Sequence, residues 1–201
     1  MLNTDQKEAL QEIANIGMGQ AGEMIARALN EFTILSIPRI LILKPNLVAP
    51  ALTRMVGPKH VSAVRQAFHG ALRGEAIVLY GEKNCHELAG MMGYETSADH
   101  ASELEILLDI SNILVGACLG GIAGQLKLDI GFSSPSLLAD QVPISDILDI
   151  ENVSWQNALL IEVNFQLEKH NFSSHLATFI PEQEIAVLAS AIDRFLETLF
   201  S

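Results

Sequence analysis

The sequence is poor in positive charge and in cysteine. Its 12 lysine and arginine residues stand against 24 aspartate and glutamate residues, so the net charge is −12. A surface of that sign repels phosphate backbones and anionic lipid, and we therefore expect no nucleic-acid partner and no membrane-surface role. The two cysteines, Cys85 and Cys118, have no CxxC spacing. They indicate buried free thiols in a reducing cytoplasm.

The sequence also lacks a recognisable leader and an unbroken apolar run of bilayer length. Its first residues form neither a basic segment nor an apolar one. The most apolar stretch, residues 106–124, is interrupted by Asp109, Ser111 and Asn112. Hydrophobic residues make up 49% of the chain and charged residues 18%, a balance typical of a packed core. We therefore expect a soluble cytoplasmic protein.

The hydrophobic pattern predicts one order of elements twice. Each half contains a long helix, an extended stretch with an internal proline, a short helix, a hairpin and a closing helix. The first half places them at residues 4–28, 33–43, 47–56, 60–80 and 84–92. The second half begins its helix near Ser102 and places the others at 129–138, 144–149, 161–180 and 182–199.

One spacing relates the two halves. Five pairs of identical residues lie 97 positions apart: Asn15 and Asn112, Ile13 and Ile110, Ile16 and Ile113, Gly19 and Gly116, and Pro38 and Pro135. Five matches in one register favour an internal duplication. We predict an α/β fold of layered α+β type, with one domain over residues 1–201. Its repeats would cover about 4–94 and 101–201, with one sheet built from both and the two long helices packed on one face.

The first residues of each long helix carry a recurring polar stripe. Glu8, Glu12, Asn15 and Gly19 lie three or four positions apart, so a helix places them on one face, away from the apolar face. Glu105, Asp109, Asn112 and Gly116 repeat the pattern. A solvated helix face is the plain alternative, and it is what most charged stripes are.

Two of the recurring residue types disfavour a merely solvated face. Asparagine is a poor residue inside a helix because its side chain competes for backbone hydrogen bonds. A mid-helix glycine costs about 1 kcal/mol relative to alanine. Both recur at matching positions, which indicates a surface that another backbone approaches closely.

The spacing of the stripe resembles the signature of the CheC-like phosphatases of bacterial chemotaxis. Glu12 and Asn15 are separated by two residues, and Pro38 follows Asn15 after 22 more; Asp109, Asn112 and Pro135 repeat these counts. The motif occurs twice, so among the CheC, CheX and FliY types the chain most resembles CheC. Two departures stand out: Glu8 and Glu105 replace the usual Asp or Ser, and Asp109 replaces Glu.

The resemblance implies a hydrolase that removes the aspartyl phosphate of a CheY-like response regulator. In that mechanism Asn15 and Asn112 orient the attacking water, and Glu12 and Asp109 pair with the partner's lysine. Glu8, Gly19, Glu105 and Gly116 would contact the partner. The chain would need no cofactor of its own, because the regulator supplies Mg²⁺. The family also pairs with the CheD deamidase, although no residue here indicates that partner.

Three other functions compete with the phosphatase. Residues 17–22 match GxGxxG, but the helical pattern runs through them and leaves no free helix N-terminus for a phosphate. None of the six histidines forms an HxxxH or HExxH pair, so no metal site is expected. The strongest rival is a non-catalytic adaptor that binds a response regulator or a flagellar switch component.

Overall fold

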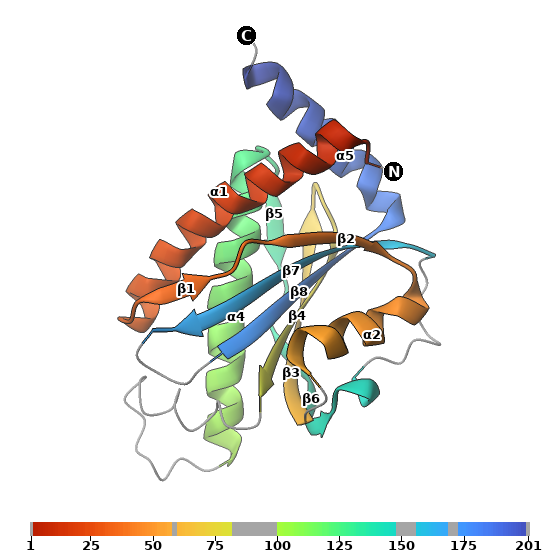
Figure 1. The fold of residues 1–201 in the computed structure, drawn as a ribbon. Coiled ribbons are helices and arrows are strands. Elements are labelled where there is room, and N and C mark those ends of the chain that lie inside the picture. The colour runs from red at the N-terminus through yellow and green to blue at the C-terminus, as the bar shows by residue number, and fades with distance from the viewer. Residues whose placement is uncertain (1, 58–59, 82–99, 148–155, 169–172, 200–201) are drawn as a thin grey trace.

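An antiparallel sheet lies between two layers of helices (Figure 1). The structure is a computed structural model that describes residues 2–57, 60–81, 100–147, 156–168 and 173–199. The predicted helix at 84–92 lies outside these residues, as do all but the last residue of the stretch 95–100, which we expect to connect the repeats, and the expected turn of the second hairpin at 169–171. The layered α+β architecture predicted from the sequence is confirmed.

The sheet has eight strands and draws on both halves of the chain. They are β1 (Thr33–Leu35), β2 (Arg39–Leu43), β3 (His60–Gly70), β4 (Gly74–Gly81), β5 (Ile130–Phe132), β6 (Ser136–Pro143), β7 (Ala158–Leu167) and β8 (Ser173–Pro181). The order is β1-β7-β8-β4-β3-β5, with β2 also on β7 and β6 also on β3. Each half therefore contributes the two strands that precede its hairpin to the hairpin of the other half.

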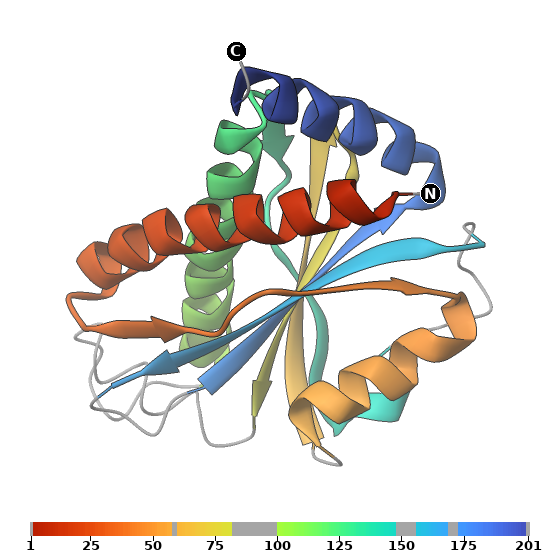
Figure 2. The ribbon, with the colours of Figure 1, turned by 45° about the horizontal axis from the view of Figure 1, so that its top comes forward.

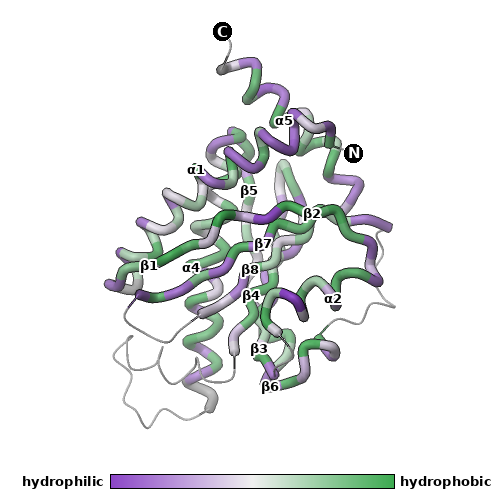
Figure 3. The backbone as a smooth tube through the Cα atoms, in the orientation of Figure 1, coloured by the Kyte–Doolittle hydropathy of each residue, from purple (hydrophilic) through white to green (hydrophobic). Residues whose placement is uncertain are grey.

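Three helices cover one face of the sheet, and the other face carries α2 (Pro45–Val56) and the 3-10 turn η1 (Ile144–Asp146) (Figure 2). The three are α1 (Thr4–Leu29), α4 (His100–Gln125) and α5 (Glu182–Leu199). One hydrophobic core fills the space under α1, α4 and α5, and a smaller one lies under α2 and η1. Figure 3 shows hydrophilic and hydrophobic residues alternating along α1, as expected of a helix with one buried face.

The helices α1 and α4 cross at two glycines. A Cβ built on Gly121 would lie 2.6 Å from the carbonyl oxygen of Gly17, and one built on Gly17 would lie 2.8 Å from the backbone nitrogen of Ile122. Only glycine, which has no Cβ, allows two helix backbones to approach this closely. The crossing therefore depends on a glycine from each helix.

Each extended stretch is divided at its proline, as the missing N–H of proline requires. Pro38 lies between β1 and β2, and Pro135 lies between β5 and β6. The Ser36 hydroxyl accepts from the backbone N–H of Asn164, and the Ser133 hydroxyl accepts from that of Ala67. Both pairs are related by the same 97-residue spacing, as a duplicated chain would place them.

The structure adds three details that the residue pattern alone does not give. Helix α1 begins at Thr4, as predicted, and it is capped by Asn3, whose side chain accepts from the Gln6 N–H in a capping box. Met24 follows the buried Ala21 at helical spacing, yet it is 58% exposed. Glu162 alternates with apolar neighbours along β7, yet it is buried, and Arg39 and Arg54 approach its carboxylate at 3.4 and 3.8 Å.

Helix α4 is apolar because the fold buries it. Residues Glu103–Gln125 are long and apolar enough to cross a bilayer by length and composition, yet 67% of the most apolar window is buried inside the protein. Its apolar residues include Ile106, Leu107 and Ile110, which belong to the larger core. Packing inside the fold accounts for the composition of this helix.

Gly121→Ala should destabilise the protein, because its Cβ would overlap the backbone of Gly17. We expect a loss of about 1–3 kcal/mol in the free energy of unfolding, measured by urea denaturation. The matched control is Gly19→Ala, since a Cβ there meets nothing within 4 Å. The control should gain about 1 kcal/mol from helix propensity. Equal stabilities of the two variants would contradict the close crossing.

Candidate functional site

The polar stripe of α1 lies on the solvent face of the helix. Glu8, Glu12, Asn15 and Gly19 are all exposed, whereas Leu10, Ile13 and Ala14, on the opposite face, are buried in the larger core. The helix thus separates its two faces as the residue spacing predicts. The acids and the amide are free to meet a partner without disturbing the core.

The stripe of α4 is also accessible. Glu105, Asp109 and Asn112 are exposed, and Gly116 is half-buried. A Cβ on Gly116 would meet nothing within 4 Å. Both stripe glycines therefore border open space, and the close backbone contact inside the protein is made by Gly17 and Gly121 instead. No feature of the sequence distinguished these two kinds of glycine.

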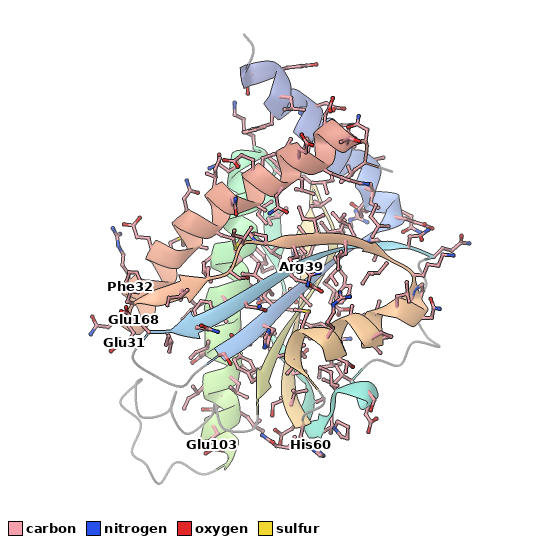
Figure 4. All side chains as sticks on the ribbon, in the orientation of Figure 1. Glu31, Phe32, Arg39, His60, Glu103 and Glu168 are labelled. Atoms are coloured by element: carbon pink, nitrogen blue, oxygen red, sulfur yellow. The ribbon has the colours of Figure 1, made fainter. Side chains whose placement is uncertain are left out.

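An open hollow of about 540 Å³ adjoins Asn15. Asn15 and Gly19 form part of its lining on α1, and Phe32 and Ile37 line it from the chain around β1. Phe32 is 61% exposed and Ile37 is 71% exposed. Figure 4 shows Phe32 at the edge of the molecule beside Glu168, whose backbone N–H donates to the Phe32 carbonyl at 3.1 Å. The first stripe thus borders a concave surface with apolar edges.

Asn112 differs from Asn15 in its surroundings. Its side-chain oxygen accepts a hydrogen bond of 2.8 Å from Nε2 of Gln66, a buried residue of β3. The same nitrogen donates to the Ser133 carbonyl, also at 2.8 Å. In the part of the chain that the structure describes, the side chain of Asn15 makes no hydrogen bond. Gln66 lies inside a predicted strand, and nothing in the sequence pattern singled it out.

Hydrogen bonds to the two proline junctions explain why a proline at fixed spacing belongs to the motif. Nε2 of Gln11, the residue before Glu12, donates to the Pro38 carbonyl at 2.7 Å. On the second helix, Gln66 connects Asn112 to Ser133, two residues before Pro135. Each junction is thus tied to its motif helix, so the spacing along the chain reflects a contact in space.

The other candidate groups are accounted for by structure. Residues 17–22 lie within the continuous helix α1, so the GxGxxG match has no helix N-terminus beside it. Burial raises the pKa of the Cys118 thiol to about 12, which keeps it protonated and unreactive at neutral pH. Among the described residues, no three His, Cys, Asp or Glu side chains gather in a group that could hold a metal ion.

No family model matches the sequence, and no curated protein matches it either. Solved structures do resemble it. FliY of Thermotoga maritima is 16% identical, with a TM-score of 0.69, over 97% of this chain and 99% of that one. The middle domain of FliM from H. pylori is 8% identical, with a TM-score of 0.63, over 94% and 99% of the two chains.

A third similar structure is the chemotaxis protein CheX of Desulfovibrio desulfuricans. It is 13% identical, with a TM-score of 0.53, over 84% of this chain and 99% of that one. The protein therefore has the fold shared by chemotaxis proteins of the CheC, CheX and FliY type. This agreement in fold confirms the resemblance first drawn from the motif spacing.

Proposed function

We propose that the protein is a cytoplasmic phosphatase that hydrolyses the aspartyl phosphate of a CheY-like response regulator. The observation that carries the proposal is the placement of Glu12 with Asn15 and of Asp109 with Asn112. Each pair lies on the exposed face of a long helix, on a fold of the CheC, CheX and FliY type. Hydrolysis of an acyl phosphate requires positioning and charge stabilisation more than a strong base, because the bond is already activated.

The amides and the acids would have separate tasks. An asparagine amide orients a water molecule for in-line attack on phosphorus, as a glutamine does in GTPases. Attack by the water breaks the bond between phosphorus and the acyl oxygen, and it releases inorganic phosphate and the partner's carboxylate. Glu12 and Asp109 would pair with a lysine of the partner, and the partner's own Mg²⁺ would neutralise charge on the phosphoryl group. Contacts with the regulator would extend to Glu8, Gly19, Glu105 and Gly116.

The second candidate function is a non-catalytic adaptor on the same surface. One similar structure is titled a FliG–FliM complex and another a FliM–SpeE complex, so proteins of this fold also occur in assemblies. An adaptor needs an accessible surface but has no use for two exposed mid-helix amides. The phosphatase therefore accounts for more of the observed residues.

Replacing both amides should abolish hydrolysis without unfolding the protein. In Asn15→Ala combined with Asn112→Ala, we expect phosphate release to fall on the order of 10²-fold or more, the scale of one preorganised polar group. Exposed helix positions favour alanine, so the double variant should remain folded, as circular dichroism can check. Turnover near that of the unaltered protein in a folded double variant would support the adaptor instead.

Chelation should act on the partner alone. We expect EDTA to stop phosphate release from the phosphorylated regulator, because the metal belongs to the regulator. The thermal unfolding midpoint of the isolated chain should not change. The measurement is differential scanning calorimetry with and without chelator, and tight binding of Mg²⁺ to the isolated chain in a calorimetric titration would contradict the expectation.

The two sites should be unequal, with the first more active. Asp109 is shorter than Glu12 by one methylene, about 1.5 Å of bond length, and a misplacement of about 1 Å can cost around 10²-fold in rate. Asn15→Ala should therefore reduce turnover more than Asn112→Ala. Asp109→Glu should raise the activity that remains in Asn15→Ala. Steady-state phosphate release by each variant measures the relative activity of the two sites. If Asn112→Ala reduces turnover more than Asn15→Ala, the second site is the more active one and the prediction is wrong.

A further inference from the structure

The most exposed apolar side chains of the described chain lie beside the first motif. Among the large hydrophobic residues that the structure describes, Ile37 and Phe32 are the two most exposed. Both line the hollow that also contains Asn15 and Gly19 (Figure 4). Neighbouring apolar side chains left in water around a concave surface are typical of an interaction site. The hollow and the motif therefore form one continuous surface.

The second motif has no such apolar rim. The positions 97 residues after Phe32 and Ile37 are occupied by Asp129 and Ser134, which are polar and exposed. The strand order puts β1, beside the hollow, and β5, beside Asp129, at opposite ends of the sheet. The rim thus belongs to the first motif alone, although the two motifs match in sequence spacing.

The charge of the protein restricts what can occupy the hollow. With a net charge of −12, the chain repels a second copy of itself as well as nucleic acid and anionic lipid. Glu12, three residues before Asn15, offers its carboxylate to a cation of the partner. An exposed ion pair of this kind contributes little to affinity, so burial of apolar surface must supply the remainder. The suitable occupant is a protein surface with an apolar side chain close to a lysine.

We propose, on the basis of the proposed function, that the hollow is the docking surface for the response regulator. An apolar side chain of the regulator, close to its phosphorylated aspartate, enters the hollow between Phe32 and Ile37. Docking in this position brings the phosphoryl group to Asn15 and the regulator's lysine to Glu12. A regulator that reaches the second motif binds without this anchor, so the first motif is the preferred site.

Gly19 keeps the hollow open. It lines the hollow, and a Cβ built on it would meet nothing within 4 Å. Packing inside the protein therefore does not require a glycine at this position, and a mid-helix glycine weakens a helix. The missing side chain instead leaves room on the outer surface for a group that belongs to the partner.

The simpler explanation is that Phe32 and Ile37 are ordinary exposed hydrophobic residues. Such residues are common on protein surfaces when they occur singly, as Leu47 does on α2 and Val187 on α5. Phe32 and Ile37 differ because they share one hollow with a motif amide. The backbone of Phe32 is also held in place, since its carbonyl accepts from the Glu168 N–H.

The docking surface is tested by binding, without any need for turnover. The probes are the CheY-like regulators encoded in the same genome, each as its beryllofluoride complex, in isothermal titration calorimetry with the full chain. Phe32→Ser combined with Ile37→Ser should raise Kd about tenfold or more, the scale of losing an aromatic anchor. Gly19→Leu should also raise Kd, because it fills the hollow even though it adds apolar surface. Circular dichroism checks that each variant is folded.

Two control variants separate the hollow from general surface effects. Leu47→Ser removes an exposed apolar side chain from α2, on the other face of the sheet. Asp129→Ala alters the position in the second half that matches Phe32. Both should leave Kd within about twofold, as peripheral substitutions do. An unchanged Kd in Phe32→Ser/Ile37→Ser, or an equal rise in Leu47→Ser, would overturn the inference.

The remaining outcomes distinguish the docking surface from the proposed function. Analytical ultracentrifugation could show a dimer that Phe32→Ser/Ile37→Ser dissociates while Kd for the regulator is unchanged; a second copy would then cover the hollow, and the inference would be wrong. Weaker binding by the same variant, with no phosphate release by the unaltered protein, would support the docking surface and contradict the phosphatase. An unaltered protein that binds none of the regulators would overturn both.

Discussion

The contact of Gly17 with Gly121 sets how closely the two motif helices α1 and α4 pack above the sheet. The two long helices cross with their backbones in contact and occupy one layer above the sheet. Each helix buries the face that meets the sheet and the other helix, so its opposite face is exposed to solvent. These solvent-exposed faces carry the acids and the asparagines of the two polar stripes. A bulkier residue at the crossing would lift one helix off the sheet, and the spacing between the two stripes would change with it. The position of the candidate site is thus a consequence of how the core is packed.

Much of the fold could be predicted from the sequence because its signals are local. The helix 182–199 and the prolines between short strands follow from periodicity and from the missing N–H of proline. Contacts between distant residues could not be predicted. Glu162 alternates with apolar neighbours as an exposed residue would, and only the approach of Arg39 and Arg54 from other elements makes its burial tolerable.

In the candidate site, too, the local features could be predicted from the sequence and the contacts between distant residues could not. Helical spacing was enough to place Glu12 beside Asn15 and Asp109 beside Asn112 on exposed faces. The contact of Gln66 with Asn112 joins residues 46 positions apart, and no periodicity reports a pair of that kind. The two motifs are alike in sequence and differ in surroundings, so the structure separates what the spacing alone treats as equivalent.

The exchange of short strands between the halves has a consequence for how the chain folds. Strands β1 and β2 can form their pairing only with β7, which lies more than a hundred residues further along the chain. Strand β3 likewise pairs with β5 and β6, which follow it in the second half. Contacts of such large sequence separation slow folding, because loop entropy is lost before the contacts form. While the chain is being synthesised, the first half is complete on the ribosome with its hairpin edge and short strands unpaired. Exposed strand edges invite pairing with other chains. A nascent chain of this protein is therefore vulnerable until its last hairpin emerges, and binding of its first half by a chaperone would protect it for that interval.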